Sequence, residues 1–207
     1  MTIPKINSLQ PRTDALLLYC DEPLSLEQLE READVADRSS VEGITSAERR
    51  RERLMWRRML REHCGQSIDV EYAADGAPRI KDFPYKNISV SHCRGVVAVV
   101  ASDGVCGVDV ERKDRRFESV ASRYISEREW SLLQRCGCER SLFLAVVWCA
   151  KECLYKMAGR AGLDLREELS VEDVDLRRGI VRARVAGCES VEMLLIEKEE
   201  YLILYCC

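Results

Sequence analysis

The chain has 207 residues, of which 46% are hydrophobic and 33% charged, a composition that excludes a disordered chain. The 32 basic and 36 acidic side chains give a net charge of -4, so bulk attraction to nucleic acid or to an anionic membrane is not expected. The chain has no apolar run of about 18 residues, and Met1 to Gln10 lacks the basic-then-apolar order of a signal peptide. We therefore expect a cytoplasmic protein without a membrane or nucleic-acid partner.

Eleven cysteines raise the alternatives of a disulfide framework or a zinc site. Most of them stand singly inside apolar runs, and no C-x-x-C pair occurs. Cys136 and Cys138 form only a C-x-C pair, and histidine adjoins cysteine only at His63-Cys64 and His92-Cys93. The pattern favours buried free cysteines, which behave as small hydrophobic residues in a reducing compartment.

The first half of the chain contains short apolar runs, one amphipathic segment and several turn signals. In chain order these predict a strand at 15–19, a short helix at 25–37, a helix from Thr45 or Ser46 to about Cys64, a strand at 68–72, a turn at 75–76, and strands at 87–90 and 96–101 around a turn at 91–95.

The second half begins at the Asp103-Gly104 turn, where we place the junction of two lobes, 1–103 and 104–207. Its pattern predicts a strand at 105–110, helices at 117–135 and 140–158, and antiparallel strands at 171–176, 180–185, 191–196 and 201–205. Because both halves hold helices followed by strands, we expect an α+β fold of two similar lobes in a pseudo-twofold arrangement.

Two acidic residues stand at alternate positions of the strand Gly107-Val108-Asp109-Val110-Glu111. The period of two directs Asp109 and Glu111 to one face of the strand and the valines to the other. Paired carboxylates suit a hard cation such as Mg²⁺, which takes carboxylates together with substrate phosphates and water. The alternative is a strand with one solvated face, and Arg112 and Lys113 could pair with the acids.

A polar stripe runs along the helix Trp148-Cys149-Ala150-Lys151-Glu152-Cys153-Leu154-Tyr155-Lys156. Trp148, Glu152 and Lys156 share one face at i, i+4 and i+8, whereas the opposite face is apolar. Taken alone, this stripe is also compatible with an exposed Glu–Lys pair beside a tryptophan at the edge of the core.

Together, G-V-D-V-E and W-C-A-K-E-C-L-Y-K resemble the two signature motifs of the 4'-phosphopantetheinyl transferase superfamily, G-[IV]-D-[IVL]-E and W-[ST/C]-x-K-E-[AS/C]-x-x-K. The strand residues Ile88 to His92, which end in Ser-His, and the turn 75–79 resemble two further family elements. The chain length is similar to that of the two-lobed, surfactin-synthetase-activating type, which implies a monomer with its site in the cleft between the lobes.

This resemblance implies transfer of the phosphopantetheine arm of coenzyme A to a serine hydroxyl of an acyl or peptidyl carrier protein, with release of 3',5'-ADP. It implies a site for Mg²⁺, with Mn²⁺ as the alternative ion, at Asp109, Glu111 and Glu152. It further implies that Glu152 accepts the serine proton, that Lys156 contacts phosphate and assists the leaving group, and that the helical region after Phe117 meets the carrier.

The resemblance also implies the residues that hold coenzyme A. Ser91 and His92 match positions that hold its phosphate, His92 with a catalytic role as well. In the arginine-rich helix 49–61, the candidates for the 3'-phosphate are Arg53 and Arg61. Ala77 replaces the usual phosphate-binding lysine, so that contact is expected to be lost or to pass to Arg79 or Lys81. The rival hypotheses are a relative that binds coenzyme A without turnover and an RNA-binding arginine helix.

Overall fold

The computed structural model describes the chain except for residues 1–4, 13, 73–77 and 82. The chain divides into two compact units, Met1–Gly104 and Val105–Cys207. Each unit combines helices with an antiparallel sheet, so the predicted α+β fold class is confirmed. In the part of the chain that is described, no helix is both long enough and apolar enough to cross a membrane.

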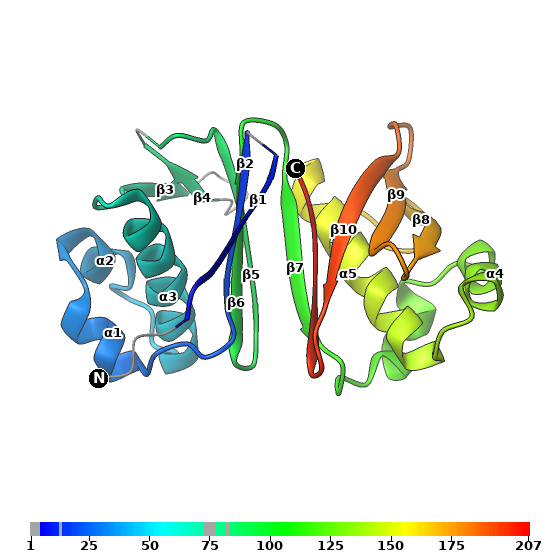
Figure 1. The fold of residues 1–207 in the computed structure, drawn as a ribbon, viewed down its shortest axis with the longest axis horizontal. Helices are drawn as coiled ribbons and strands as arrows, with labels where there is room; N and C mark the ends of the chain where they lie inside the picture. The colour runs from blue at the N-terminus through cyan, green and yellow to red at the C-terminus, as the bar shows by residue number, and fades with distance from the viewer. Residues whose placement is uncertain (1–4, 13, 73–77, 82) are drawn as a thin grey trace. The chain divides into compact units, whose positions relative to one another are not determined.

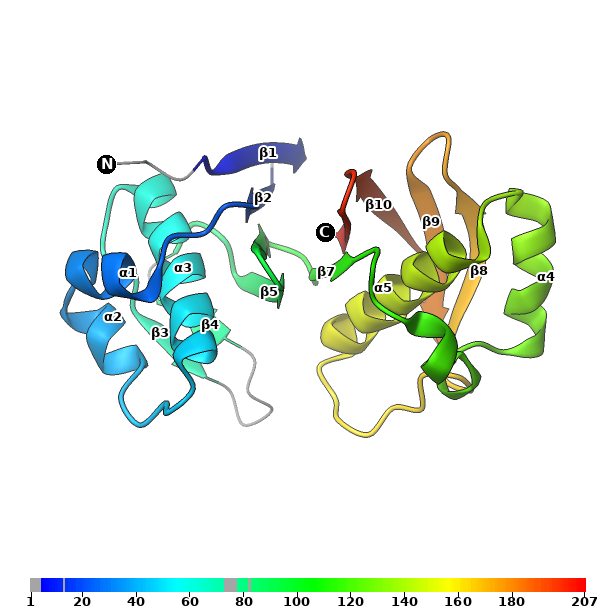
Figure 2. The same ribbon diagram turned by 90° about the horizontal axis from the view of Figure 1, so that it is seen from below.

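In the first unit α3 packs against one face of a four-stranded antiparallel sheet of order β1-β2-β6-β5, and α1 and α2 pack on α3 (Figures 1 and 2). Buried side chains between them include Leu16 and Leu18 on β2 and Met55 and Met59 on α3. The elements are β1 Asn7–Arg12, β2 Ala15–Cys20, α1 Leu26–Glu32, α2 Val35–Ser40, α3 Ala47–Cys64, β3 Val70–Tyr72, β4 Pro78–Ile80, β5 Asn87–Cys93 and β6 Val96–Ser102.

The second unit contains a five-stranded antiparallel sheet of order β7-β11-β10-β9-β8, with α5 packed across one face (Figure 2). The predicted helix 140–158 and the four antiparallel strands of the tail are confirmed. The elements are β7 Gly107–Arg112, the 3₁₀ helix η1 Phe117–Arg123, α4 Glu127–Cys136, α5 Arg140–Ala158, β8 Leu169–Asp175, β9 Ile180–Val185, β10 Val191–Glu197 and β11 Tyr201–Cys206.

Capping residues explain two helix predictions that were wrong. The expected helix 117–135 is a 3₁₀ turn and a separate helix, because Ser126 begins α4 with a capping box that it shares with Glu129. The expected helix 25–37 is likewise two helices, since the Asp34 side chain accepts a hydrogen bond from the Asp37 amide and starts α2.

Strand pairing extends beyond what the sequence pattern predicted. The expected turn 91–95 begins only after Cys93, because β5 continues through His92, which pairs with Val97 of β6. Gly95 supplies the left-handed φ of 82° that this tight hairpin requires. Strands β1 and β4 were missed because their sequences contain prolines, and the predicted turn at 75–76 lies outside the described residues.

Candidate active site

The acidic face of β7 is directed at α5. A Cβ atom on Gly107 would lie 2.7 Å from the carbonyl oxygen of Cys153, so only glycine permits this close approach of strand and helix. Residues two and four positions further along the strand share the face of Gly107, and these are Asp109 and Glu111. Asp109 is buried and Glu111 half-buried.

The polar stripe of α5 meets these two carboxylates at both of its ends. Trp148 Nε1 donates a hydrogen bond to Glu111 Oε1 at 2.9 Å. One helical turn beyond Glu152, Lys156 Nζ donates to Asp109 Oδ1 at 2.9 Å and to the Val108 carbonyl oxygen at 2.8 Å. Because Glu152 stands midway between Trp148 and Lys156 on the same face of α5, it is held over the acidic strand.

The three carboxylates influence one another electrostatically. Burial, and next the charge of Asp109, raise the pKa of Glu111 to about 7, against the opposing effect of Arg115. Burial and then Asp109 also raise the pKa of Glu152, whereas Lys156 and Arg115 act in the opposite direction. The proximity of Asp109 therefore disfavours the ionised forms of Glu111 and Glu152 and creates a site that gains from added positive charge.

Arg115 supplies part of that positive charge. Its guanidinium forms an ion pair with Glu111 and lies over two aromatic rings, 4.6 Å from the centroid of Trp148 and 5.0 Å from that of Phe117. Sequence reasoning did not place Arg115 beside these rings, because its ring contacts depend on how η1 and α5 fold back toward the end of β7. Arg115 therefore belongs to the site.

The donor set Asp109, Glu111 and Glu152 fits a hard divalent cation, because it consists of carboxylate oxygens that gather beside one helix. Within the described residues, however, no three His, Cys, Asp or Glu side chains are already arranged as a metal site. Lys156 and Arg115 instead pair with Asp109 and Glu111. The chemistry of the donors thus suits the ion.

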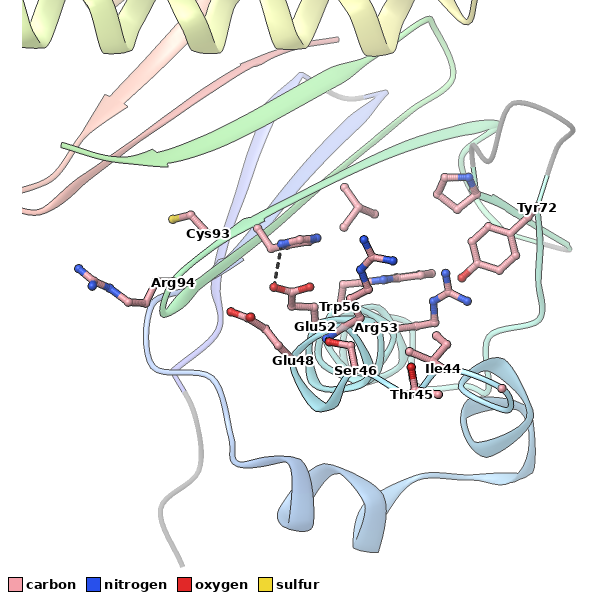
Figure 3. A pocket seen from close by; sticks show the side chains of 15 residues that line it. Ile44, Thr45, Ser46, Glu48, Glu52, Arg53, Trp56, Tyr72, Cys93 and Arg94 are labelled. Atoms are coloured by element: carbon pink, nitrogen blue, oxygen red, sulfur yellow. Dashed lines mark hydrogen bonds and ion pairs between the residues drawn. The ribbon is translucent and has the colours of Figure 1, made fainter. Parts of the chain in front are cut away.

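A second candidate site is a cavity of about 960 Å³ in the first unit (Figure 3). Its lining combines the cationic side chains Arg49, Arg53 and Arg94 with the aromatic residues Trp56 and Tyr72. The guanidinium of Arg53 donates to the Ser40 carbonyl oxygen at 3.0 Å and lies 4.5 Å from the centroid of the Tyr72 ring. Such a cavity can accept an anionic group beside an aromatic surface.

His92 also lines this cavity, together with Glu52. Its Nδ1 lies 2.9 Å from Glu52 Oε1, and this pair is the dashed line in Figure 3. The His92 side chain is 48% exposed and that of Glu52 only 12%, so the histidine is the accessible partner. Burial raises the pKa of Glu52, with a further contribution from Glu48.

Residues 105–206, nearly the whole second unit, match the sequence model of the 4'-phosphopantetheinyl transferase superfamily. The chain belongs to this superfamily. It follows that the protein is a transferase of the group whose members move phosphopantetheine from coenzyme A to carrier proteins. The match contains both the acidic face of β7 and the polar stripe of α5. A comparison with curated proteins gave no match.

The structure brings only some of the expected coenzyme A residues of this transferase together. His92 and Arg53 line the cavity, whereas Ser91 is buried and is not among the described lining residues. Arg61 forms ion pairs with Asp37 and, at 3.5 Å, with Asp34. Arg79 is exposed on β4 and is also outside the described lining. The expected loss of a contact at Ala77 lies outside the described residues.

Most arginines of α3 are engaged in ion pairs within the first unit. Arg57 is buried and donates to Asp37 Oδ1 at 2.8 Å and to the Ile68 carbonyl oxygen at 2.6 Å. Arg58 pairs with Glu62 at 2.6 Å and also with Glu32. Sequence reasoning did not single out Arg49 as a cavity residue, although it stands four positions before Arg53 and therefore on the same helical face.

A buried ion pair between α4 and α5 was also missed. Lys151 is fully buried, and its Nζ lies 2.8 Å from Glu129 Oε1 and 2.5 Å from the Tyr124 carbonyl oxygen. Glu129 accepts further hydrogen bonds from the backbone amides of Ser126 and Val171, both at 2.8 Å. The available signal was a lysine surrounded by apolar helix positions. The pair links α5, which carries Glu152, to α4 and β8.

Proposed function

We propose that the protein transfers the 4'-phosphopantetheine arm of coenzyme A to a serine hydroxyl of an apo acyl or peptidyl carrier protein and releases 3',5'-ADP. The observation that supports this proposal best is the meeting of Trp148 and Lys156 of α5 with Glu111 and Asp109 of β7, within the segment that matches the superfamily. The presence of two α+β units favours the two-lobed type of this transferase.

In this proposal Asp109, Glu111 and Glu152 hold a divalent cation, Mg²⁺ or alternatively Mn²⁺. The bound ion would neutralise charge on the pyrophosphate. The side chains that surround the carboxylates prepare them for this task. Trp148 orients Glu111 through its indole N–H, and Lys156 orients Asp109.

Glu152 is proposed as the base that accepts the proton of the carrier serine. The serine oxygen then forms a bond to the phosphorus of the phosphopantetheine arm, the bond from this phosphorus to the oxygen of 3',5'-ADP breaks, and the electron pair leaves with the ADP. Burial and the charge of Asp109 raise the pKa of Glu152, which makes this carboxylate a stronger base. The ammonium group of Lys156 already donates to Asp109 and to the Val108 carbonyl oxygen. Its remaining N–H would donate to phosphate.

The cavity of the first unit is proposed to hold phosphate and adenosine groups of coenzyme A. His92 and Arg53 provide accessible donors on its wall, and Arg49 and Arg94 add positive charge. Trp56 and Tyr72 offer aromatic surface for a base. The acidic residues Glu48 and Glu52 also line the cavity, so binding of a phosphate group there depends on where the cationic side chains lie relative to these two acids.

The carrier is proposed to dock on the basic segment after β7, because carrier domains of this kind are acidic. Arg116 is the N-cap residue of η1 and Arg123 is its last residue, and both are exposed. Arg112 and Lys113 already pair with Glu200 at 3.1 Å and Glu197 at 2.5 Å. Arg116 and Arg123 are therefore the better candidates for contacts with the carrier.

The activity is tested by incubating the protein with coenzyme A, Mg²⁺ and a panel of apo carrier proteins, and by measuring the carrier mass. A gain of one phosphopantetheine arm, together with release of 3',5'-ADP, is the expected result. Binding of coenzyme A without a mass gain on any carrier would contradict the proposal and favour a binding-only relative.

Replacing His92 by alanine is expected to raise the KM for coenzyme A by about tenfold and to change kcat little, because a charge-assisted contact to a remote phosphate is lost. The KM and kcat are measured in the same transfer assay. His63→Ala is the matched control, since His63 is exposed and lies outside the described cavity lining. An unchanged KM in the His92 variant would exclude this contact.

The affinity for Mg²⁺ is expected to rise with pH by up to about tenfold per unit between pH 6 and 7, and to level off above pH 8. The reason is that burial and Asp109 raise the pKa of Glu111 to about 7. Its proton therefore competes with the ion below that pH and no longer does so above it. Calorimetric titration in buffers of different ionisation enthalpy measures both the affinity and the released proton. Identical affinities at pH 6 and 8 would contradict the expectation.

A further inference from the structure

A pair of thiols lies at the joint between α4 and α5, apart from the active-site residues described above. Cys136 is the last residue of α4, and Cys138 directly precedes Glu139, the N-cap of α5. Their sulfur atoms are 3.1 Å apart. Both cysteines are free and half-buried. This arrangement brings together two groups that can be joined by loss of two hydrogen atoms.

The backbone at Gly137 produces this proximity. Gly137 has a φ of 62° and a ψ of 22°, the left-handed conformation that ends a helix, and its amide donates to the Leu133 carbonyl oxygen at 3.3 Å. The Cys136 thiol contacts the same carbonyl oxygen at 3.4 Å. A residue with a side chain would adopt this conformation less readily, so the glycine allows the chain to turn back and place the two sulfur atoms side by side.

The surroundings of the pair permit access by a small molecule. Gln134, Arg135, Gly137, Glu139 and Arg140 are all exposed. The two arginines on either side of the pair can attract an anionic reagent. Other cysteines, such as Cys149 and Cys153, are completely buried in the core and are shielded from such reagents.

We propose that Cys136 and Cys138 form a reversible dithiol–disulfide site that exchanges with small disulfides of the glutathione class. A thiolate of the pair attacks one sulfur of oxidised glutathione, which forms a mixed disulfide and releases one molecule of glutathione. The second thiolate then attacks the protein sulfur of the mixed disulfide and releases a second glutathione. The pair is oxidised, one glutathione disulfide is reduced to two thiols, and the two protons of the cysteines pass to the departing glutathiones.

The same geometry predicts that the site is readily reversed. A disulfide sulfur–sulfur distance is about 2.05 Å, so both side chains must move together within a turn of only three residues. A disulfide that closes so small a ring is strained in the folded and the unfolded chain alike, so it is more oxidising than a structural disulfide and easily reduced. Burial, and next the contact with Cys136, raise the pKa of the Cys138 thiol to about 12, so this thiol is protonated at neutral pH and exchange is expected to be slow.

The test equilibrates the folded protein with mixtures of oxidised and reduced glutathione, blocks free thiols with N-ethylmaleimide, and digests with trypsin. Cleavage after Arg135 and Arg140 gives the peptide Cys-Gly-Cys-Glu-Arg, which contains both cysteines and no other. The expected product is this peptide lacking two hydrogen atoms and carrying no adduct. The folded protein should form it at a ratio of oxidised to reduced glutathione about tenfold lower than the same chain in guanidinium, because the turn already holds the thiols together.

Variants separate this site from general thiol oxidation. Cys136→Ser and Cys138→Ser should each abolish the peptide that lacks two hydrogen atoms, whereas Cys188→Ser, which changes an exposed cysteine elsewhere, should leave its formation unchanged. The proposal is overturned if the folded protein carries adducts on both sulfurs at every ratio. It is also overturned if folding gives no advantage over the chain in guanidinium. None of these results depends on the transferase activity.

Discussion

Replacing Glu152 by glutamine is expected to lower phosphopantetheine transfer by about 10²- to 10⁴-fold, the range typical for loss of a general base. Glutamine keeps the shape of the side chain but can neither accept the serine proton nor provide the third carboxylate charge for the ion. Glu152 is half-buried and has no role in the apolar core, so the fold should persist. The rate is measured by the mass gain of an apo carrier under saturating coenzyme A and Mg²⁺.

Glu199→Gln is the matched control for this experiment, because Glu199 is exposed in the turn between β10 and β11. It makes the same chemical change and should leave the transfer rate unaltered. Circular dichroism and the urea midpoint of both variants check that the fold is intact. Transfer by the Glu152 variant at more than about a tenth of the original rate would show that Glu152 is not the base.

Replacing Lys151 by methionine is expected to lower the free energy of unfolding by about 3–5 kcal/mol, since it leaves the Glu129 carboxylate buried without its cation. The two side chains are 0% and 1% exposed. Burial lowers the pKa of Lys151 and the charge of Glu129 opposes this effect, so each charge depends on the other. The free energy of unfolding is measured by urea denaturation at pH 7.

The double variant Lys151→Met with Glu129→Gln identifies the cause of that loss. The Ser126 and Val171 amides donate to different oxygens of Glu129, so glutamine can accept from only one of them, but glutamine carries no charge. We therefore expect the double variant to be more stable than Lys151→Met alone. If the two substitutions destabilise additively, the lost stability comes from packing of the lysine stem and not from the buried charge.

The local periodicity of the chain was sufficient to predict which side chains share a face. Alternation in β7 predicted that Asp109 and Glu111 point the same way, and helical spacing predicted the stripe of Trp148, Glu152 and Lys156. Both patterns depend on backbone geometry that repeats within a few residues, so they can be derived without knowledge of the tertiary contacts. The α+β class and the antiparallel tail followed from the same periodicities.

The errors concern features that local patterns describe poorly. The expected helix 117–135 was divided at Ser126, because a capping box stabilised by Glu129 competed successfully with continuous helical spacing. Strand β5 continued through His92, since pairing with β6 decides where a strand ends. In both places hydrogen-bond partners, more than residue preference, determined the boundary.

The sequence by itself determined the acidic face of β7, the polar stripe of α5 and, through their joint resemblance, the superfamily. Only the tertiary structure decided which charges meet. It paired Lys156 with Asp109, Arg115 with Glu111 and Lys151 with Glu129, and it placed Arg61 against Asp37 and away from the described cavity lining. Lys156 and Asp109 are 47 positions apart in the sequence, and such an ion pair forms only where packed helices and strands bring the two residues together. Contacts at such a separation are not encoded in any local repeat.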